Sequence, residues 1–270
     1  MPLEPLTSIG RTAAAGIRFV LTDIDDTLST DGRLTAAAYA ALERLQQAGY
    51  KVLAITGRPA GWCDLIARFW PVDGVVGENG AFYFRYCHQE RRMVRHFAAS
   101  EAERAANRRR LDAIAAQVLA RVPGAAIAAD QAYRVADLAI DFREDVSPLP
   151  PAAIDAIVGI FTAAGATAKV SSIHVNGWFG AYDKLAMTRN LLATEFAVEL
   201  PRDQLAVLFV GDSPNDEPMF AALPLSVGVA NVLEFKDCMR GLPAYVTMAR
   251  SGEGFVELAD YLLAAQQRVT

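Results

Sequence analysis

The chain has 270 residues, which is enough for one large domain or two smaller ones. Its 53% hydrophobic and 21% charged residues are ordinary for a globular protein with a buried core, and the net charge of −5 argues against a general nucleic-acid or acidic-membrane binder. No apolar run reaches the roughly 18 residues that span a bilayer. The N-terminus lacks a secretory pattern, and the three cysteines are scattered. We therefore expect a cytoplasmic protein with reduced thiols.

Short apolar runs alternate with helical patterns in the first 80 residues, which predicts parallel strands flanked by helices. The first strand ends directly before a cluster of acids. Thr35 is a suitable N-cap for the first long helix, and Gly49 supplies its stop. The expected elements are strand 17–22, helix 35–48, strand 51–55, a helix that ends near 70 and strand 72–76.

The middle third has a different order of elements and predicts an inserted α+β domain of about a hundred residues. We expect residues 1–81 and 181–270 to form the core and residues 82–180 to form the insertion. The elements expected within it are a hairpin over 82–86 and 92–95, helix 100–122, strands 125–129 and 136–142, helix 151–164, and strands 168–172 and 173–179.

The alternating pattern resumes in the last third. A strongly apolar strand is expected over 205–210, a helix near Pro214, short strands over 225–229 and 245–248, and a closing helix over 254–267. Together these patterns predict an α/β protein with a Rossmann-like parallel-sheet core and an inserted α+β cap domain.

Three carboxylates follow the first strand within four residues: Asp23, Asp25 and Asp26. Side chains two residues apart at a strand end point the same way, so Asp23 and Asp25 can converge on one centre. Because like charges repel, a hard divalent cation is a natural partner for such a cluster. An acidic loop that only caps the next segment is the structural alternative.

Three further polar groups stand where the sheet pattern predicts strand ends. Thr56, Gly57 and Arg58 offer a hydroxyl and backbone amides that suit phosphate oxygens. Lys184 begins a helical run, and Asp212, Asn215 and Asp216 follow the apolar strand after it. Ligands of open α/β sheets bind at the carboxyl ends of the strands, where all of these groups are expected to meet.

In this order the motifs resemble those of the haloacid dehalogenase-like hydrolase superfamily. Asp23-x-Asp25-x-Thr27 is similar to its first motif, Thr56 to its second, Lys184 to its third, and Gly211-Asp212-x-x-x-Asp216 to its fourth. The cap insertion between the second and third motifs, and the run Glu78-Asn79-Gly80-Ala81 before it, resemble the sugar-phosphatase-like (Cof-type) branch. Asp26 departs from the pattern, because relatives often carry glycine there.

The resemblance implies a magnesium-dependent phosphatase that forms an aspartyl-phosphate on Asp23. Asp25 would act as acid and base, while Lys184, Thr56, Gly57 and Arg58 would bind the phosphoryl oxygens. Asn215 would position the phosphate or Lys184. The implied Mg²⁺ site comprises Asp23, Asp25 (through its backbone carbonyl), Asp212 and, in outer support, Asp216.

Substrate recognition is expected in the cap. His174, Asn176 and Trp178 alternate on the strand that returns to the core, so they can face the cleft and bind a sugar or another polyol. A strand whose large residues only pack on the core is an equal alternative.

Other functions share some of these motifs. A phosphomutase uses the same aspartyl-phosphate and remains an alternative. A signalling receiver domain also gathers acids, a threonine and a lysine, but its phosphorylated aspartate follows a later strand. A non-catalytic sugar-phosphate binder should lack Asp23 or Asp25. We expect a small phosphorylated metabolite as the partner, no nucleic acid or membrane, and a monomer or homodimer.

Overall fold

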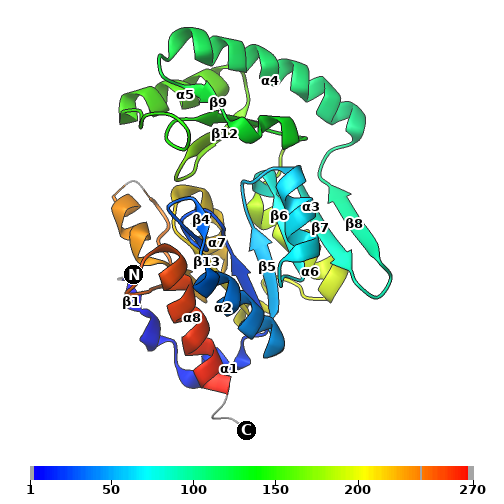
Figure 1. The fold of residues 1–270 in the computed structure, drawn as a ribbon, viewed down its shortest axis with the longest axis vertical. Coiled ribbons are helices and arrows are strands. Elements are labelled where there is room, and N and C mark those ends of the chain that lie inside the picture. Colours follow the sequence, from blue (N-terminus) through cyan, green and yellow to red (C-terminus); the bar gives the residue numbers. More distant parts are fainter. Residues whose placement is uncertain (1–2, 238, 267–270) are drawn as a thin grey trace.

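A computed structural model describes residues 3–237 and 239–266 of the chain, which form a large sheet with helices on both faces and a smaller domain beyond one end of it (Figure 1). The strands from β1 to β6 in the sheet order are parallel, and the last two strands form an antiparallel hairpin. In spatial order the strands are β1 (Glu4–Pro5), β15 (Tyr245–Val246), β14 (Ser226–Gly228), β13 (Val207–Gly211), β2 (Phe19–Thr22), β5 (Lys51–Ile55), β6 (Gly74–Gly77), β7 (Phe82–Cys87) and β8 (Arg92–Phe97).

Two hydrophobic layers enclose this sheet. Side chains of α1 (Arg11–Gly16), α2 (Ala36–Gln47), α3 (Ala60–Phe69) and α8 (Ser251–Gln266) pack with one face, and those of α6 (Lys184–Phe196) and α7 (Glu217–Ala222) pack with the other. Both faces of the central strands are therefore buried, which explains why these strands read as continuous apolar runs. The α/β fold class expected from the sequence is confirmed.

The predicted elements of the core are present, with small shifts at their ends. Thr35 caps α2, since its Oγ1 accepts a hydrogen bond of 3.2 Å from the amide of Ala38. The last helix begins at Ser251, earlier than the expected start at Gly254. Gly252 allows close packing there, because a Cβ at this position would lie 2.8 Å from the carbonyl oxygen of Leu28. The expected end of this helix at Gln267 lies outside the described residues.

The inserted domain has a sheet and a hydrophobic core of its own. Its strands, in spatial order, are β11 (Thr167–Val170), β12 (His174–Trp178), β10 (Leu138–Asp141) and β9 (Ala126–Ile127), and α4 (Glu101–Arg121) and α5 (Pro151–Ala163) pack on one face of them. Figure 1 shows this domain standing over the end of the core sheet at which the parallel strands finish. Any site at those strand ends is therefore covered by the insertion.

The hairpin that was expected to open the insertion belongs to the core sheet. Strand β7 pairs with β6 in antiparallel register, with Val76 opposite Tyr83. Phe82 and Phe84 are buried in the core, which explains why the hairpin extends the large sheet. The expected start of the insertion at residue 82 is therefore wrong with respect to the sheets: the separate domain follows Phe97.

Shorter elements complete the chain and shape the surroundings of the strand ends. A small flap follows β2, formed by β3 (Ser29–Thr30) and β4 (Arg33–Leu34). The remaining short helices are η1 (Leu6–Ser8), η2 (Glu78–Gly80), η3 (Ala129–Tyr133), η4 (Gln204–Ala206), η5 (Pro214–Asp216) and η6 (Ala230–Phe235).

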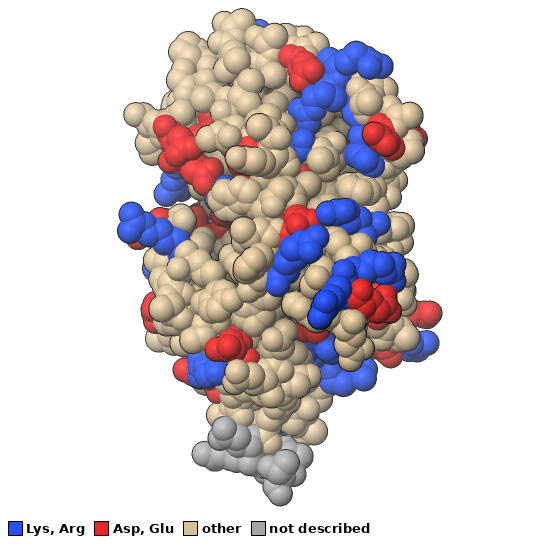
Figure 2. Space-filling model, turned by 45° about the vertical axis from the view of Figure 1, so that its right-hand side comes forward, with Lys and Arg blue, Asp and Glu red and all other residues tan. Residues whose placement is uncertain are grey.

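The surface carries charges of both signs. Figure 2 shows Lys and Arg side chains interspersed with Asp and Glu on the face that it presents. None of the helices within residues 3–237 and 239–266 has the length and apolar character needed to cross a membrane. Cys63 and Cys87 are free thiols, and Cys238 lies outside the described residues.

Candidate active site

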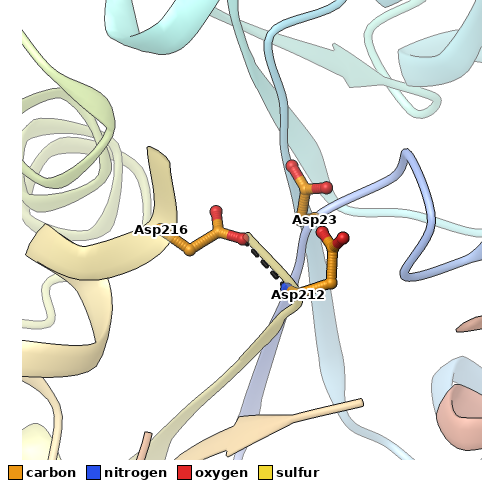
Figure 3. Close-up of side chains that lie close together, drawn as sticks. All are labelled: Asp23, Asp212 and Asp216. Atoms are coloured by element: carbon orange, nitrogen blue, oxygen red, sulfur yellow. Dashed lines mark hydrogen bonds between the residues drawn. The ribbon is translucent and has the colours of Figure 1, made fainter. Parts of the chain in front are cut away.

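Three of the predicted acids meet at the ends of β2 and β13. One carboxylate oxygen each of Asp23, Asp212 and Asp216 lies within 4.8 Å of the other two, and all three residues are buried. Figure 3 shows Asp23 and Asp212 side by side at adjacent strand ends, with Asp216 approaching from the short helix η5. Strands β2 and β13 are parallel neighbours, so acids nearly 190 positions apart in sequence come together, as reflected by the pairing of Val210 with Thr22.

Lys184 joins two of these acids. Its Nζ donates to Oδ1 of Asp23 at 2.7 Å and to Oδ1 of Asp216 at 2.8 Å. The lysine begins α6, and Gly80 lets η2 pack against that helix start, because a Cβ at Gly80 would lie 2.0 Å from the carbonyl oxygen of Asp183. The structure therefore brings Lys184 to the acids, as the motif order predicts.

The electrostatics of this cluster favour an added cation. Burial raises the pKa of Asp23 to about 8, against the effect of Lys184 and with a further contribution from Asp216. Burial also raises the pKa of Asp212, and Asp23 adds to that rise. Burial alone would lower the pKa of Lys184, but Asp216 and Asp23 outweigh it and raise that pKa. Three carboxylates share one ammonium, and their oxygens are the donors that hard divalent ions such as Mg²⁺ prefer.

Asp212 is oriented by two residues besides the acids. Thr27 Oγ1 donates to one of its carboxylate oxygens at 3.3 Å, and Asn231 Nδ2 donates to the other at 3.1 Å. Asn231 also donates to the backbone carbonyl of Asp26 at 3.0 Å. Asp26 itself has φ 55°, the left-handed conformation that explains why glycine suits this position and why aspartate is tolerated there.

The carboxylate of Asp25 has a different partner from the other acids. Arg58 donates to it from Nε at 2.9 Å and from Nη2 at 2.7 Å. The same guanidinium reaches the inserted domain, where Nη2 donates to Oε1 of Glu144 at 2.7 Å. Arg58 therefore connects the first motif with the cap. Only the backbone carbonyl of Asp25 is left to serve the predicted metal site.

The loop after β5 surrounds the space above Asp23 only in part. Gly57, Arg58 and Asn215 line a small cavity of about 10 Å³ next to Asp23, together with cap residues. Thr56 is fully buried beside it, and its Oγ1 accepts a hydrogen bond of 3.0 Å from the amide of Arg58. Asn215 donates to Oδ1 of Asn79 at 3.5 Å, and among the described residues the buried Nδ2 of Asn79 has no hydrogen-bond partner.

Of the three cap residues expected to read the substrate, His174 and Asn176 line this cavity, but all three contact protein groups. His174 Nε2 lies 2.9 Å from Oε2 of Glu144, a close polar contact whose geometry is not that of a hydrogen bond. Asn176 Nδ2 donates to Asp137 at 3.0 Å. Trp178 is buried and stacks on Tyr182. Their side chains therefore tie the cap together in this conformation.

A second set of contacts fastens the cap to the core. The buried carboxylate of Glu78 accepts hydrogen bonds from the amides of Val135, Ala136 and Asp137 in the cap, at 2.7–3.2 Å. In return, Nη1 of Arg134 donates to the carbonyl oxygen of Gly57 at 2.8 Å. Sequence reasoning placed Glu78 in a motif but did not predict this role, since none of its partners is close to it in sequence.

Several supporting residues were not predicted at all: Glu144, Arg134, Asp137 and Asn231. Asn231 lies on η6 and the other three lie on the inserted domain, and each is distant in sequence from the motif that it contacts. An unpaired acid in a loop is common on protein surfaces, so nothing in the local pattern marked Glu144. Only the folded arrangement gives these residues their partners.

A parallel core with acids and a lysine gathered at its strand ends, covered by an inserted α+β domain, is the architecture expected from the motif order. Comparison with known proteins agrees with the resemblance inferred from the motif order. Residues 20–108 match the haloacid dehalogenase-like hydrolase family. Among curated proteins, no sequence match was found.

Solved structures share the fold over nearly the full length. A protein from Thermoplasma acidophilum is 19% identical, with a TM-score of 0.67, covering 92% of this chain and 98% of its own. The C-terminal domain of a trehalose-6-phosphate phosphatase from C. albicans is 14% identical, with a TM-score of 0.70 over 97% and 98%. A sucrose-phosphatase from Synechocystis, in complex with sucrose and phosphate, is 15% identical, with a TM-score of 0.61 over 90% and 97%.

The segment that carries the first motifs thus matches the haloacid dehalogenase-like hydrolase family, and the fold of nearly the whole chain is shared with solved structures. The resemblance inferred from the sequence is confirmed. The structures with the same fold also include a HAD/Cof-like hydrolase from Plasmodium vivax, 19% identical with a TM-score of 0.66 over 97% of this chain and 100% of its own.

Proposed function

We propose that the chain is a magnesium-dependent phosphatase that hydrolyses a small phosphorylated metabolite through an aspartyl-phosphate on Asp23. One observation carries this proposal: buried Lys184 holds Asp23 and Asp216 together beside Asp212. Three carboxylates beside one ammonium leave an excess of negative charge that a divalent cation would offset. Such a cation would also reduce the repulsion between the carboxylate nucleophile and a phosphate monoester dianion.

The residues of the chain can be given roles in that reaction. Asp23 attacks phosphorus, and the bond from phosphorus to the leaving oxygen breaks. Asp25 gives a proton to that oxygen and later takes one from the hydrolytic water. Lys184 and the amide of Gly57 bind phosphoryl oxygens, while Thr56 shapes the loop by accepting a hydrogen bond from the amide of Arg58, and Asn215 lies beside it.

Magnesium fits the donors at this site. Asp23, Asp212 and the backbone carbonyl of Asp25 would hold the ion, and Asp216 would support it from outside. When bound, the ion supplies positive charge against the phosphate dianion and the crowded carboxylates. The pairing of Asp216 with Lys184 and with the amide of Asp212 suits this outer position, because both oxygens of Asp216 already accept hydrogen bonds.

The cap conformation bears on the acid–base step. Arg58 holds both oxygens of Asp25, although Oδ2 has only a single contact of 3.1 Å with Nε. This oxygen is the freer of the two and is the one we assign to proton transfer. Because Arg58 also holds Glu144, Asp25 is fixed in place when the cap is closed.

A sugar phosphate is the substrate class expected from the sequence. Its support comes from the fold shared with a sucrose-phosphatase and a trehalose-6-phosphate phosphatase. The side chains of His174 and Asn176 provide less support than expected, because each contacts another protein side chain. A phosphomutase outcome remains the alternative, and no contact of the described residues favours it.

Phosphate release in the presence of Mg²⁺ tests the proposal. The wild-type protein should release inorganic phosphate from p-nitrophenyl phosphate, and Asp23→Asn should abolish release while the protein stays folded by circular dichroism. Asp31→Asn is a matched control: Asp31 lies in the turn of the β3–β4 flap with φ 50°, a conformation that asparagine also adopts.

Two results would contradict the proposal. Near-normal turnover by Asp23→Asn would show that Asp23 is not the nucleophile. Transfer of phosphate from one sugar hydroxyl to another without release, followed by ³¹P NMR, would favour the mutase.

A further inference from the structure

A larger cleft opens beside the small cavity at Asp23. It has a volume of about 610 Å³ and lies between α3, the β3–β4 flap and η3 of the cap. Its size is that of a typical small-molecule site. The cavity at Asp23, at about 10 Å³, holds no more than about one water in this conformation. A leaving group of any size therefore has to lie elsewhere.

The two spaces share a border. Asp25 and Arg58 belong to the lining of both. Asp25 is the residue that we assign to protonate the leaving oxygen, so the bond that breaks would lie at this border. A phosphoryl group over Asp23 would then have its leaving group directed into the larger cleft. This assignment rests on the proposed phosphatase function.

The walls of the cleft are apolar and partly aromatic. Trp62 and Leu65 of α3 are 43% and 54% exposed, and Tyr133 of the cap is 58% exposed. Exposed apolar groups gathered in one cleft commonly mark a binding site. Gly61 makes room for this arrangement, because a Cβ there would lie 3.0 Å from the Cβ of Tyr133. The wall is therefore built from both the core and the cap.

The polar side chains of the cleft other than its aromatic residues are already engaged. Among its lining side chains, those that are polar and not aromatic are Asp25, Ser29 and Arg58. Asp25 and Arg58 pair with each other, and Ser29 Oγ accepts a hydrogen bond of 3.0 Å from the amide of Asp26. A polyol placed here would lose hydration from its hydroxyl groups and regain few hydrogen bonds.

We infer that the substrate is a phosphate monoester whose leaving group carries a flat apolar ring, and that this cleft binds the ring. Hydrolysis consumes one water and yields inorganic phosphate and the ring-bearing alcohol, whose oxygen receives its proton from Asp25. Trp62, Leu65 and Tyr133 contact the ring.

Three phosphates of primary alcohols test this inference, because their intrinsic leaving-group reactivity is similar. We expect kcat/KM for 2-phenylethyl phosphate to exceed that for glucose 6-phosphate and for ethyl phosphate by about tenfold or more. A preference for glucose 6-phosphate would overturn the inference and leave the phosphatase proposal intact. Release of phosphate from p-nitrophenyl phosphate but from none of the three primary-alcohol phosphates would also overturn the inference and leave the phosphatase proposal intact. Failure with all four phosphates would overturn both.

A pair of variants on one helix locates the effect. Leu65→Gln should lower the ratio of kcat/KM for 2-phenylethyl phosphate to that for ethyl phosphate by about five- to tenfold. Phe69→Gln is the matched control: it lies four residues further along α3, is 74% exposed and is outside the cleft lining, so it should leave this ratio unchanged. Circular dichroism and thermal unfolding establish that both variants fold.

The exposed apolar residues of α3, namely Trp62, Leu65 and Phe69, form a stripe that could instead contact a second copy of the chain. Light scattering of the wild-type protein and both variants separates the two explanations. If Leu65→Gln and Phe69→Gln both dissociate a dimer and neither changes the substrate ratio, the stripe is an interface and the inference is overturned. Equal ratios for the wild type and Leu65→Gln in folded protein would overturn it as well.

Discussion

The charges around Asp23 do not balance within the protein. Asp23, Asp212 and Asp216 are buried, and the only ammonium that contacts them among the described residues is that of Lys184. Burying an uncompensated carboxylate is costly, which is expressed here as the raised pKa of Asp23, about 8. A protonated aspartate is a poor nucleophile. A bound divalent cation would favour the anion that attack requires.

The proposed acid–base role of Asp25 leads to a separate prediction about proton transfer. Asp25→Asn should lower kcat for an alkyl phosphate by about two to four powers of ten, because the leaving alkoxide then lacks its acid. The loss in the first half-reaction should be much smaller for 2,4-dinitrophenyl phosphate, whose leaving group needs no proton. Rapid-quench measurement of the initial release separates this half-reaction from dephosphorylation.

Asp25→Asn also weakens the contact with Arg58. Thermal unfolding of the variant shows whether this loss of contact lowers its stability. Full activity of Asp25→Asn on the alkyl phosphate would rule out the acid–base role. Equal losses on both substrates would point instead to a role in positioning.

The loops of the cap act through Arg58 and Glu78. Arg58 is packed under Trp62, with its guanidinium 4.4 Å from the ring centroid, and it pairs with Asp25 and Glu144 at the same time. Glu78 holds three consecutive amides of the cap. The contacts of Arg58 are ionic and include Asp25 of the first motif. Those of Glu78 are hydrogen bonds to backbone amides of the cap. The cap is therefore joined to the core at two points that differ in their response to pH.

The ionic contact between Arg58 and Glu144 depends on pH through the ionisation of Glu144. Burial alone would raise its pKa, but the contacts with His174 and Arg58 outweigh burial and lower the pKa of Glu144 to about 2. Since the folded pKa is below the unfolded value of 4.5, the stabilisation is fully present above about pH 4.5. It is lost as pH falls from there toward 2.

Glu144→Gln tests this sign. We expect the variant to have a free energy of unfolding lower than that of the wild type by about 1–2 kcal/mol above pH 5. The difference should shrink steadily between pH 4.5 and pH 3, as measured by urea unfolding at each pH. Glu90→Gln is a control, because Glu90 pairs only with Arg92 on an exposed hairpin turn. A difference that stays constant or grows on acidification would contradict the assignment.

The fold as a whole brings the four motifs to one end of the sheet and covers them with a separate domain. The acids lie directly after β2 and on segments that follow β13, while Lys184 begins the helix that follows the returning cap strand. Binding a cation to this end should therefore stabilise the entire folded chain, because the unfolded chain has no preformed site.

Magnesium should raise the melting temperature for that reason. At a concentration one hundred times Kd the gain is about 2.7 kcal/mol, or roughly 5–10 °C for a chain of this size. Asp212→Asn should abolish the response. In EDTA the variant should be at least as stable as the wild type, because one of three repelling carboxylates is gone.

Differential scanning calorimetry with Mg²⁺ and with EDTA provides the comparison. A wild-type melting temperature that does not respond to Mg²⁺ would argue against the metal site. A full response in Asp212→Asn would place the ion elsewhere.

The sequence by itself determined the α/β class, most element positions and the residues that meet at the strand ends. These depend on local signals: apolar runs, helix caps such as Thr35, and acids directly after strands. Strand β5 has the predicted bounds, and Lys184 contacts Asp23 as the motif order implied. The magnesium site and the catalytic roles remain predictions.

Only the tertiary structure decided which sheet the hairpin over residues 82–97 joins, and what the cap side chains contact. A hairpin has the same local pattern in either sheet, and its place depends on long-range pairing with β6. The contacts of Arg58, Asn176 and Glu144 likewise link segments 39–86 residues apart. Such contacts arise when separate units pack against each other, and no periodicity along the chain records them.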